Sequence, residues 1–149
     1  PWKRKFLGFS FTSHKIVKRR ISKESLERFK ANITKLTNRN HSYSLEKRIE
    51  TLNSYLVGWR GYFSNCETPS VLRELEEWIR RRLRCVILKQ WKNPRTIFRN
   101  LQKLGVGKEL AGNTASSGKG WWRLSGSQAM QFALPNKYFD DAKLCRLLF

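Results

Sequence analysis

Long apolar runs, acidic residues and cysteines are all scarce in this 149-residue sequence. No stretch approaches the ~18 consecutive apolar residues that a transmembrane helix needs. The uncharged residues 6–13 are too few and too polar for the apolar core of a secretory signal. We therefore expect neither a membrane-spanning nor a secreted protein, and no membrane partner.

The three cysteines, Cys66, Cys85 and Cys145, form no C-x-x-C pair. The only two histidines, His14 and His41, lie far from all three in sequence. This pattern argues against a zinc site and against a disulfide framework, so we expect no bound metal and a reducing cytoplasm.

Catalytic arrangements are equally sparse. No Ser/His/Asp or Cys/His combination stands out, and the glycine-rich phosphate-binding signatures are missing. Asp140 and Asp141 are adjacent, but no third carboxylate stands at a useful spacing, so a helix-cap or surface role is expected for them. The chain alone is predicted to have no catalytic residues and not to be an enzyme.

Positive charge is what the sequence has in excess. It carries 31 Lys plus Arg against 11 Asp plus Glu, a formal charge of +20. With 40% hydrophobic residues it can still form a core, so a disordered tail is excluded. Such a charge disfavours a compact monomer through self-repulsion, and a polyanionic partner is the natural explanation. The chain begins with Pro1-Trp2 and not with Met, which we interpret as a fragment of a longer protein.

Hydrophobic periodicity predicts three helices, over residues 22–39, 44–65 and 69–92. The second has the clearest pattern, with spacings of 4, 3, 4, 3 and 4 between its apolar residues. That stripe consists of Leu45, Ile49, Leu52, Leu56, Trp59 and Phe63. Ser22 and Ser44 are suitable N-caps, and short polar loops favour antiparallel neighbours. The expected fold class is mostly α, with a three-helix antiparallel bundle.

The two ends of the chain differ from this bundle. Phe6, Phe9 and Phe11 alternate with small residues, which predicts a short strand or hairpin that either belongs to a sheet elsewhere or packs on the helices. Beyond residues 92–94 the helical patterns are short, which predicts a small helical C-terminal subdomain over residues 93–149.

The sharpest candidate for function is a segment without acids. Between Glu77 and Glu109 there is no carboxylate but there are ten basic residues. They are Arg80, Arg81, Arg82, Arg84, Lys89, Lys92, Arg95, Arg99, Lys103 and Lys108. We expect many of them on one exposed face opposite the Leu/Ile face, where arginine forks suit phosphates. The alternative is a merely solvated face, which needs more nearby glutamates than the segment has.

Aromatic residues beside cations are further candidates. Tyr55, Arg60 and Tyr62 lie off the apolar stripe and are predicted to contact nucleic acid. Two adjacent tryptophans, Trp121 and Trp122, follow a glycine-rich loop and cannot both point inward on a helix. One is expected to anchor the subdomain and the other to stack on a base, and the sequence leaves open which one is core. The full predicted RNA- or DNA-binding set is Lys3, Arg4, Lys5, Lys18, Arg19, Arg20, Tyr55, Arg60, Tyr62, Arg80, Arg81, Arg82, Arg84, Lys89, Lys92, Arg95, Arg99, Lys119, Trp122 and Arg123.

Four segments resemble group II intron-encoded proteins, in order along nearly the whole chain. Residues 5–11 (KFLGFSF) resemble the end of their reverse-transcriptase palm, and residues 52–63 (LNSYLVGWRGYF) resemble their maturase region, called domain X. Residues 78–92 are similar to the last helix of that region. Residues 118–125 (GKGWWRLS) are similar to a segment near the end of the short bacterial members.

The resemblance implies residues 1–21 as the end of the palm, 22–92 as the thumb/maturase domain and 93–149 as a C-terminal DNA-binding domain. It implies binding of group II intron RNA to promote folding and splicing, a grip on the template–primer duplex, and help in binding target DNA during retrohoming. The upstream fingers and palm of the same protein would be partners. Mg²⁺ would belong to that palm and to the intron RNA, with no cofactor in this chain.

Two motifs of the family are missing here. Without the YxDD motif, polymerisation is not expected on this chain, although the parent protein would be an RNA-directed DNA polymerase. Without the HNH endonuclease, the chain is similar to the bacterial group IIC type, which implies the bacterial cytoplasm and association with the nucleoid.

Two other classes stay open on the residues alone. One is a free-standing basic RNA-binding protein of the ribosomal type. The other is a helix-turn-helix DNA-binding module, for which residues 93–104 could supply the recognition helix.

Overall fold

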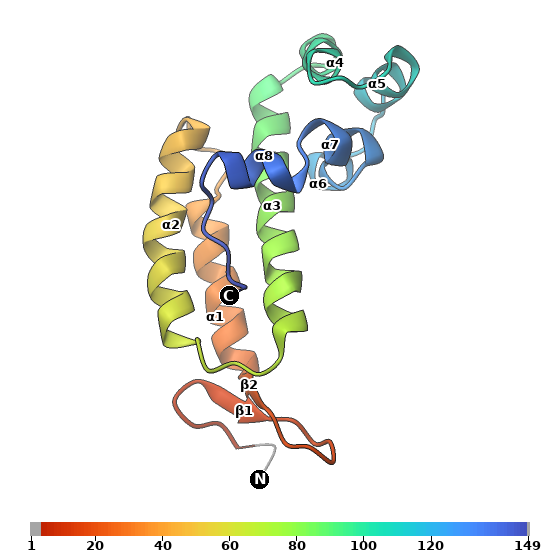
Figure 1. Cartoon of the computed structure of the whole chain (residues 1–149). Coiled ribbons are helices and arrows are strands. Elements are labelled where there is room, and N and C mark those ends of the chain that lie inside the picture. The colour runs from red at the N-terminus through yellow and green to blue at the C-terminus, as the bar shows by residue number, and fades with distance from the viewer. Residues whose placement is uncertain (1–3, 149) are drawn as a thin grey trace.

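A two-stranded hairpin, three long helices and five shorter helices follow one another in the computed structural model, which describes residues 4–148 (Figure 1). The prediction of a mostly α fold with a short N-terminal strand region is confirmed.

The hairpin pairs β1 (Phe9–Phe11) with β2 (Arg19–Ile21) in antiparallel register, with Phe9 opposite Ile21. It packs on the helices, since the ring of Phe9 lies 5.3 Å from that of Phe63. Gly8 turns the chain into β1 with φ +83°, and a Cβ there would come within 3.2 Å of the Phe63 ring. A side chain at position 8 would therefore meet both backbone strain and a steric clash.

The first two long helices are α1 (Lys23–Leu36) and α2 (Leu45–Tyr62). Ser22 and Ser44 cap them as predicted, because their side chains accept hydrogen bonds from the N–H groups of Ser25 and Lys47. Both helices end a few residues earlier than the apolar pattern suggested. In α1 the stop coincides with Thr37, whose hydroxyl donates to the carbonyl of Ile33 at 2.6 Å.

The predicted apolar stripe of α2 faces α1 and forms the bundle core. Leu52 and Leu56 are fully buried, as are Phe29 and Ile33 on α1. Trp59 is half-buried and its ring lies 4.3 Å from that of Phe29. These contacts confirm the helical period and give this pair of helices its hydrophobic interface.

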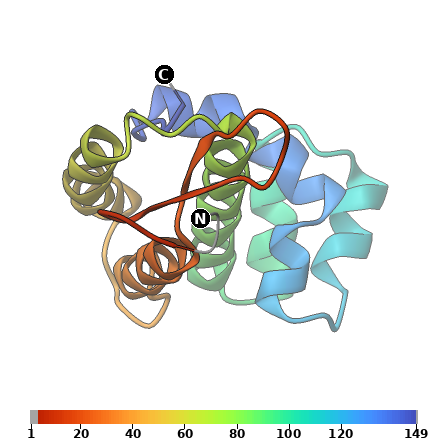
Figure 2. The ribbon, with the colours of Figure 1, turned by 90° about the horizontal axis from the view of Figure 1, so that it is seen from below.

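The third helix, α3 (Pro69–Trp91), stands between two groups of helices. Figure 2 shows α1 and α2 on one side of it and the helices of residues 94–133 on the other. As a result α3 buries residues around most of its circumference along its second half, including Leu83, Arg84, Val86 and Leu88. A helix in this position cannot present a broad solvent face.

The C-terminal part consists of α4 (Pro94–Lys103), α5 (Lys108–Ala115), α6 (Trp121–Ser125), α7 (Gln128–Ala133) and α8 (Asn136–Asp141). Leu101, Met130 and Phe139 from these helices are fully buried and share one hydrophobic core with α1–α3. The helix α3 ends at the predicted boundary, but apolar packing continues across it. The division of the chain at residue 92 stays a prediction.

After α8 the chain runs back between the ribbons of α2 and α3 (Figure 1). Asn53 on α2 donates to the carbonyl of Lys143 at 2.8 Å and accepts from the N–H of Cys145 at 2.7 Å. Glu76 on α3 accepts from the N–H of Leu147, whose side chain is 1% exposed. No periodic pattern in the sequence indicated this docking.

Candidate nucleic-acid interface

Two of the predicted phosphate-binding arginines are not on the surface. Arg80 and Arg84 are only 6% and 7% exposed, so their predicted place on an open face is wrong. Arg84 donates to the carbonyl of Leu134 at 2.8 Å and to Asn136 Oδ1 at 3.3 Å. Burial, and then the nearby charge of Arg80, lower the pKa of Arg84 from its ordinary value. Both side chains are covered because the C-terminal helices pack on this side of α3.

The rest of the arginine run also ties α3 to its neighbours. Arg81 Nη2 donates to the carbonyl of Trp122 at 2.9 Å, on the C-terminal side. Arg82 Nε donates to Thr37 Oγ1 at 2.7 Å, on the α1 side, and Lys89 Nζ donates to Asn40 at 2.6 Å. These half-buried cations are packing and hydrogen-bonding groups within the protein, in contrast to the exposed fan that helical geometry alone predicted.

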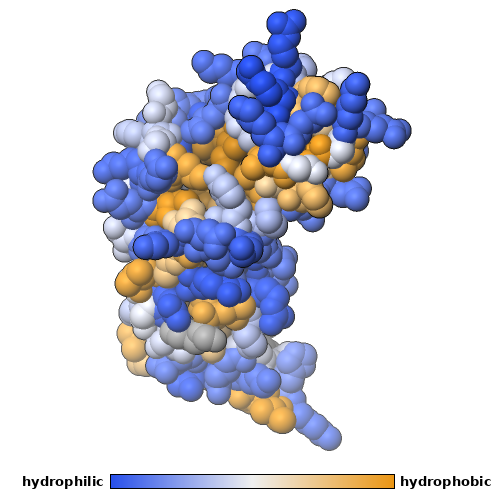
Figure 3. Space-filling view, turned by 45° about the horizontal axis from the view of Figure 1, so that its top comes forward, coloured by the Kyte–Doolittle hydropathy of each residue, from blue (hydrophilic) through white to orange (hydrophobic). Residues whose placement is uncertain are grey.

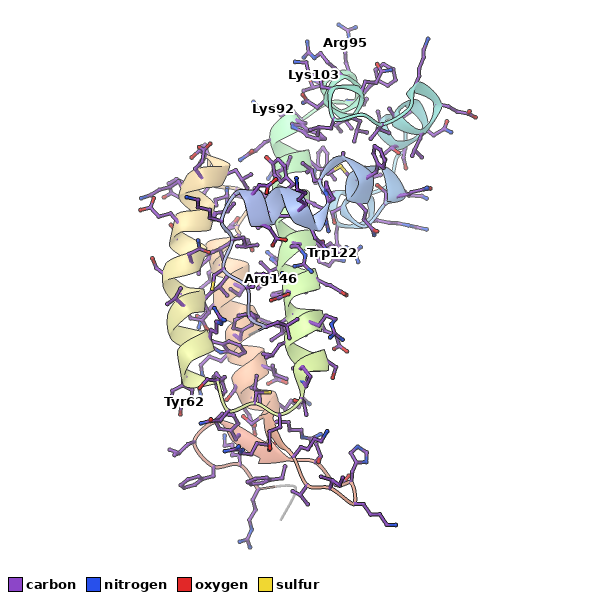
Figure 4. All side chains as sticks on the ribbon, viewed as in Figure 1. Tyr62, Lys92, Arg95, Lys103, Trp122 and Arg146 are labelled. Carbon is purple, nitrogen blue, oxygen red and sulfur yellow. The ribbon has the colours of Figure 1, made fainter. Side chains whose placement is uncertain are left out.

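A line of exposed cations lies instead along α4 and in the turn that precedes it. We call it the α4 basic stripe, and it consists of Lys92, Arg95, Arg99 and Lys103. Arg95, Arg99 and Lys103 follow one another at intervals of four, while Ile97 and Leu101 on the other side of the helix are buried. Figure 4 shows Lys92, Arg95 and Lys103 at the same end of the molecule, where Figure 3 shows hydrophilic side chains gathered.

No ion pair involves the stripe anywhere in residues 4–148. Lys103 was named in the acid-free segment but was not among the predicted binding residues. Its spacing of four from Arg99 was the signal that could have found it.

A second group of exposed cations lies at the hairpin, where Arg4, Lys5, Lys18, Arg19 and Arg20 are all exposed. Lys3 lies outside the described residues.

Two of these hairpin cations are paired with carboxylates. Lys5 lies 3.7 Å from Glu24, and Arg19 Nε lies 3.3 Å from Glu67. The backbone N–H of Arg19 also donates to Glu67 at 2.7 Å, and this bond, followed by that of the side chain, lowers the pKa of Glu67. The hairpin cations are therefore less free for phosphates than the α4 basic stripe.

Between the hairpin and the ends of α1 and α2 lies a groove of about 480 Å³. Lys5, Tyr55 and Tyr62, which the sequence placed in the binding set, all line it. Arg28 and Phe6 line it too and were not predicted. Figure 4 marks Tyr62 beside the hairpin, and its hydroxyl donates to the carbonyl of Leu7 at 2.9 Å. The half-buried Arg60 does not line this groove.

The two adjacent tryptophans divide as expected, and the structure decides which is which. Trp121 is half-buried and packs against the core, whereas Trp122 is 39% exposed. Lys119 and Arg123 beside it are exposed. One face of the Trp122 ring is covered by the guanidinium of Arg81 at 4.1 Å from the ring centroid.

No group of three or more His, Cys, Asp or Glu side chains that could hold a metal ion occurs in residues 4–148. None of the helices within this range combines the length and apolar character that crossing a bilayer requires.

The sequence matches a protein-family profile over its helical middle part. The profile of the group II intron, maturase-specific domain matches residues 26–105, more than half of the chain. The match starts within α1 and ends just after α4, so it includes the α4 basic stripe. The matched region is the maturase-specific domain and not the polymerase core. No curated protein matches the sequence.

Proposed function

Because the chain belongs to the group II intron maturase family, we propose that it promotes splicing by binding the intron RNA through exposed cations that lack carboxylate partners. The same family match disfavours a free-standing ribosomal-type protein. Binding to phosphates by such cations releases counterions, which makes the affinity strong and salt-dependent.

The observation that carries this proposal is the α4 basic stripe. The sequence has 31 basic residues, and the described residues 4–148 form five ion pairs, none of them in the stripe. Arg95, Arg99 and Lys103 are exposed on one side of α4, whose opposite side is buried, and Lys92 is exposed in the turn that precedes the helix. Exposed cations without carboxylate partners attract a polyanion, and arginine in particular suits phosphates.

The groove between the hairpin and the ends of α1 and α2 supports a second contact, with the template–primer duplex. Its lining joins the exposed Arg28 to Tyr55 and Tyr62, a combination that suits a sugar–phosphate backbone and its bases, while Lys5, also in the lining, pairs with Glu24. In this proposal the upstream fingers and palm carry the polymerase and its Mg²⁺ ions, and the present chain holds the duplex that leaves them.

Target-DNA binding during retrohoming is a further candidate function of the C-terminal part. The helix α4 follows a two-residue turn at Lys92 (φ +67°) and Asn93, and a short turn with Gly105 leads on to α5. Arg95, Arg99 and Gln102 are exposed on it and could reach base edges. We also propose that the parent protein is of the bacterial group IIC type and uses this target-DNA contact.

The test of intron-RNA binding compares two quadruple variants of equal charge. One replaces Lys92, Arg95, Arg99 and Lys103 with Gln. The other replaces the exposed Lys23, Lys35, Lys47 and Lys137, on α1, α2 and α8, with Gln. Affinity for the intron RNA is measured across a salt series, together with splicing.

The stripe variant should flatten the slope of log affinity against log salt by about 3, since each lost phosphate contact removes about 0.7–0.9. It should also lower splicing while the circular dichroism spectrum is unchanged. Equal losses in both variants would mean that net charge, and not the stripe, carries the binding.

A further inference from the structure

We propose that the open face of the Trp122 ring is a stacking site for a single unpaired nucleobase, with Arg81 as its fixed backing on the other face. The inference rests on the proposed binding of a polynucleotide and adds one specific contact to it. The ligand is a base in a single-stranded segment, because the bases of a duplex already stack on one another.

The guanidinium of Arg81 holds the ring in place. Its Cζ atom lies 4.1 Å from the Trp122 ring centroid, and its Nη2 donates to the carbonyl of the same residue at 2.9 Å. Its Nε also faces Ser125 Oγ at 3.4 Å. At Gly126 a Cβ would lie 3.0 Å from the guanidinium carbon, so this glycine leaves the space that Arg81 occupies. A ring fixed in this way loses little freedom when a base stacks on it.

The other face of the ring is accessible. Trp122 is 39% exposed, unlike its neighbour Trp121, which packs against the core. At Gly118 and Gly120, in the preceding loop, a Cβ would meet nothing within 4 Å. The loop that precedes Trp122 therefore has open space beside these two glycines.

Two exposed cations close to Trp122 in sequence are available to the phosphates beside a stacked base. Lys119 and Arg123 flank the tryptophan in sequence and are exposed, and neither forms an ion pair within the described residues 4–148. An aromatic platform bordered by cations is the combination that binds single strands with little sequence preference. The same ring without cations would be an ordinary exposed apolar residue.

The experiment measures the affinity of the chain for three probes of equal length: single-stranded oligoadenylate RNA, its DNA counterpart and a blunt RNA duplex. Trp122→Ala should weaken binding of single-stranded RNA by about 10-fold or more without changing the salt slope, since no charge is lost. Trp122→Phe should keep most of the affinity. The duplex should bind both variants and the parent chain equally.

Phe132→Ala is the matched control, because Phe132 is an exposed aromatic residue of the neighbouring helix α7 with 61% exposure. It should leave all three affinities unchanged. Stacking should also quench the emission of Trp122, measured as the difference between the parent chain and Trp122→Phe. Unfolding curves of each variant establish that the fold is intact.

The outcomes separate this inference from the proposed function. Tight RNA binding that is unaltered in Trp122→Ala would overturn the stacking site and leave intron-RNA binding standing. Failure of the parent chain to bind any of the three probes would overturn the stacking site, and failure to bind the intron RNA itself would overturn the proposed function. A loss confined to RNA would assign the site to RNA, and an equal loss on single-stranded DNA would assign it to unpaired bases of either kind.

Discussion

Glu76 on α3 holds Leu147 near the C-terminus: its Oε1 atom accepts the backbone N–H of Leu147 at 2.6 Å, and that of Leu148 at 3.0 Å. The carboxylate is 4% exposed, and its other oxygen lies 3.6 Å from Arg80 Nη1. One buried group therefore joins the end of the chain to α3 and balances the charge of a buried arginine.

Replacing Glu76 with Gln should lower the free energy of unfolding by about 3 kcal/mol, because it removes charge-assisted bonds and leaves Arg80 buried without its partner. Urea denaturation measures the change. Glu77→Gln is the control, since Glu77 is exposed and adjacent, and it should change stability by less than about 0.5 kcal/mol. Similar small effects of both substitutions would contradict the role given to Glu76.

Leu56→Ala should destabilise the protein by about 2–5 kcal/mol, because Leu56 is fully buried between α2 and its neighbours and the truncation leaves a cavity. Thermal or urea unfolding followed by circular dichroism checks this. Val57→Ala, at the next position of the same helix and 61% exposed, should have little effect. If the two substitutions cost the same, the stripe does not form the core.

Substitution by Ala at Arg84 should affect stability, whereas substitution by Ala at Arg95 should affect RNA binding. Arg84→Ala should lower stability by about 1–3 kcal/mol, because Arg84 is buried and its loss leaves the carbonyl of Leu134 without a donor. Arg95→Ala should leave stability nearly unchanged and weaken RNA binding, because Arg95 is exposed in the α4 basic stripe. Unfolding curves and a salt-dependent binding assay, made on both variants, separate the two roles. A stable Arg84→Ala protein with weakened RNA binding would reverse the assignment.

Acid should weaken the attachment of the hairpin to the bundle. The pKa of Glu67 is lowered by its bonds from the N–H and side chain of Arg19, so its contribution to stability is present above the unfolded pKa. That contribution is lost as the pH falls through the lower, folded pKa. The melting temperatures of the parent chain and Glu67→Gln should therefore differ near neutral pH and converge as the pH falls below about 4.5. A difference that stays constant with pH would rule out this linkage.

Several features followed from the sequence because they depend on neighbouring residues only. Ser22 and Ser44 cap helices because each serine hydroxyl oxygen accepts a hydrogen bond from the otherwise unpaired backbone N–H three residues later. The stripe containing Leu52 and Leu56 faces the core because the helical repeat brings such positions together. The resemblance of residues 52–63 and 78–92 to group II intron-encoded proteins agrees with the family match over residues 26–105, whereas the resembling segments 5–11 and 118–125 lie outside that match.

Tertiary structure decided which cations are available to a partner. The wheel of α3 separates Arg80 and Arg84 from its Leu/Ile face, and an isolated helix would expose both. The helices α6–α8, which begin 37 residues after Arg84 in the chain, cover that side and bury them at 6% and 7% exposure. Arg95 and Arg99 carry the same charge and stay exposed because none of the elements that the structure describes in residues 4–148 covers their side of α4. Local spacing determines the face of a helix on which an arginine lies, but only long-range packing determines whether that face meets water or the rest of the protein.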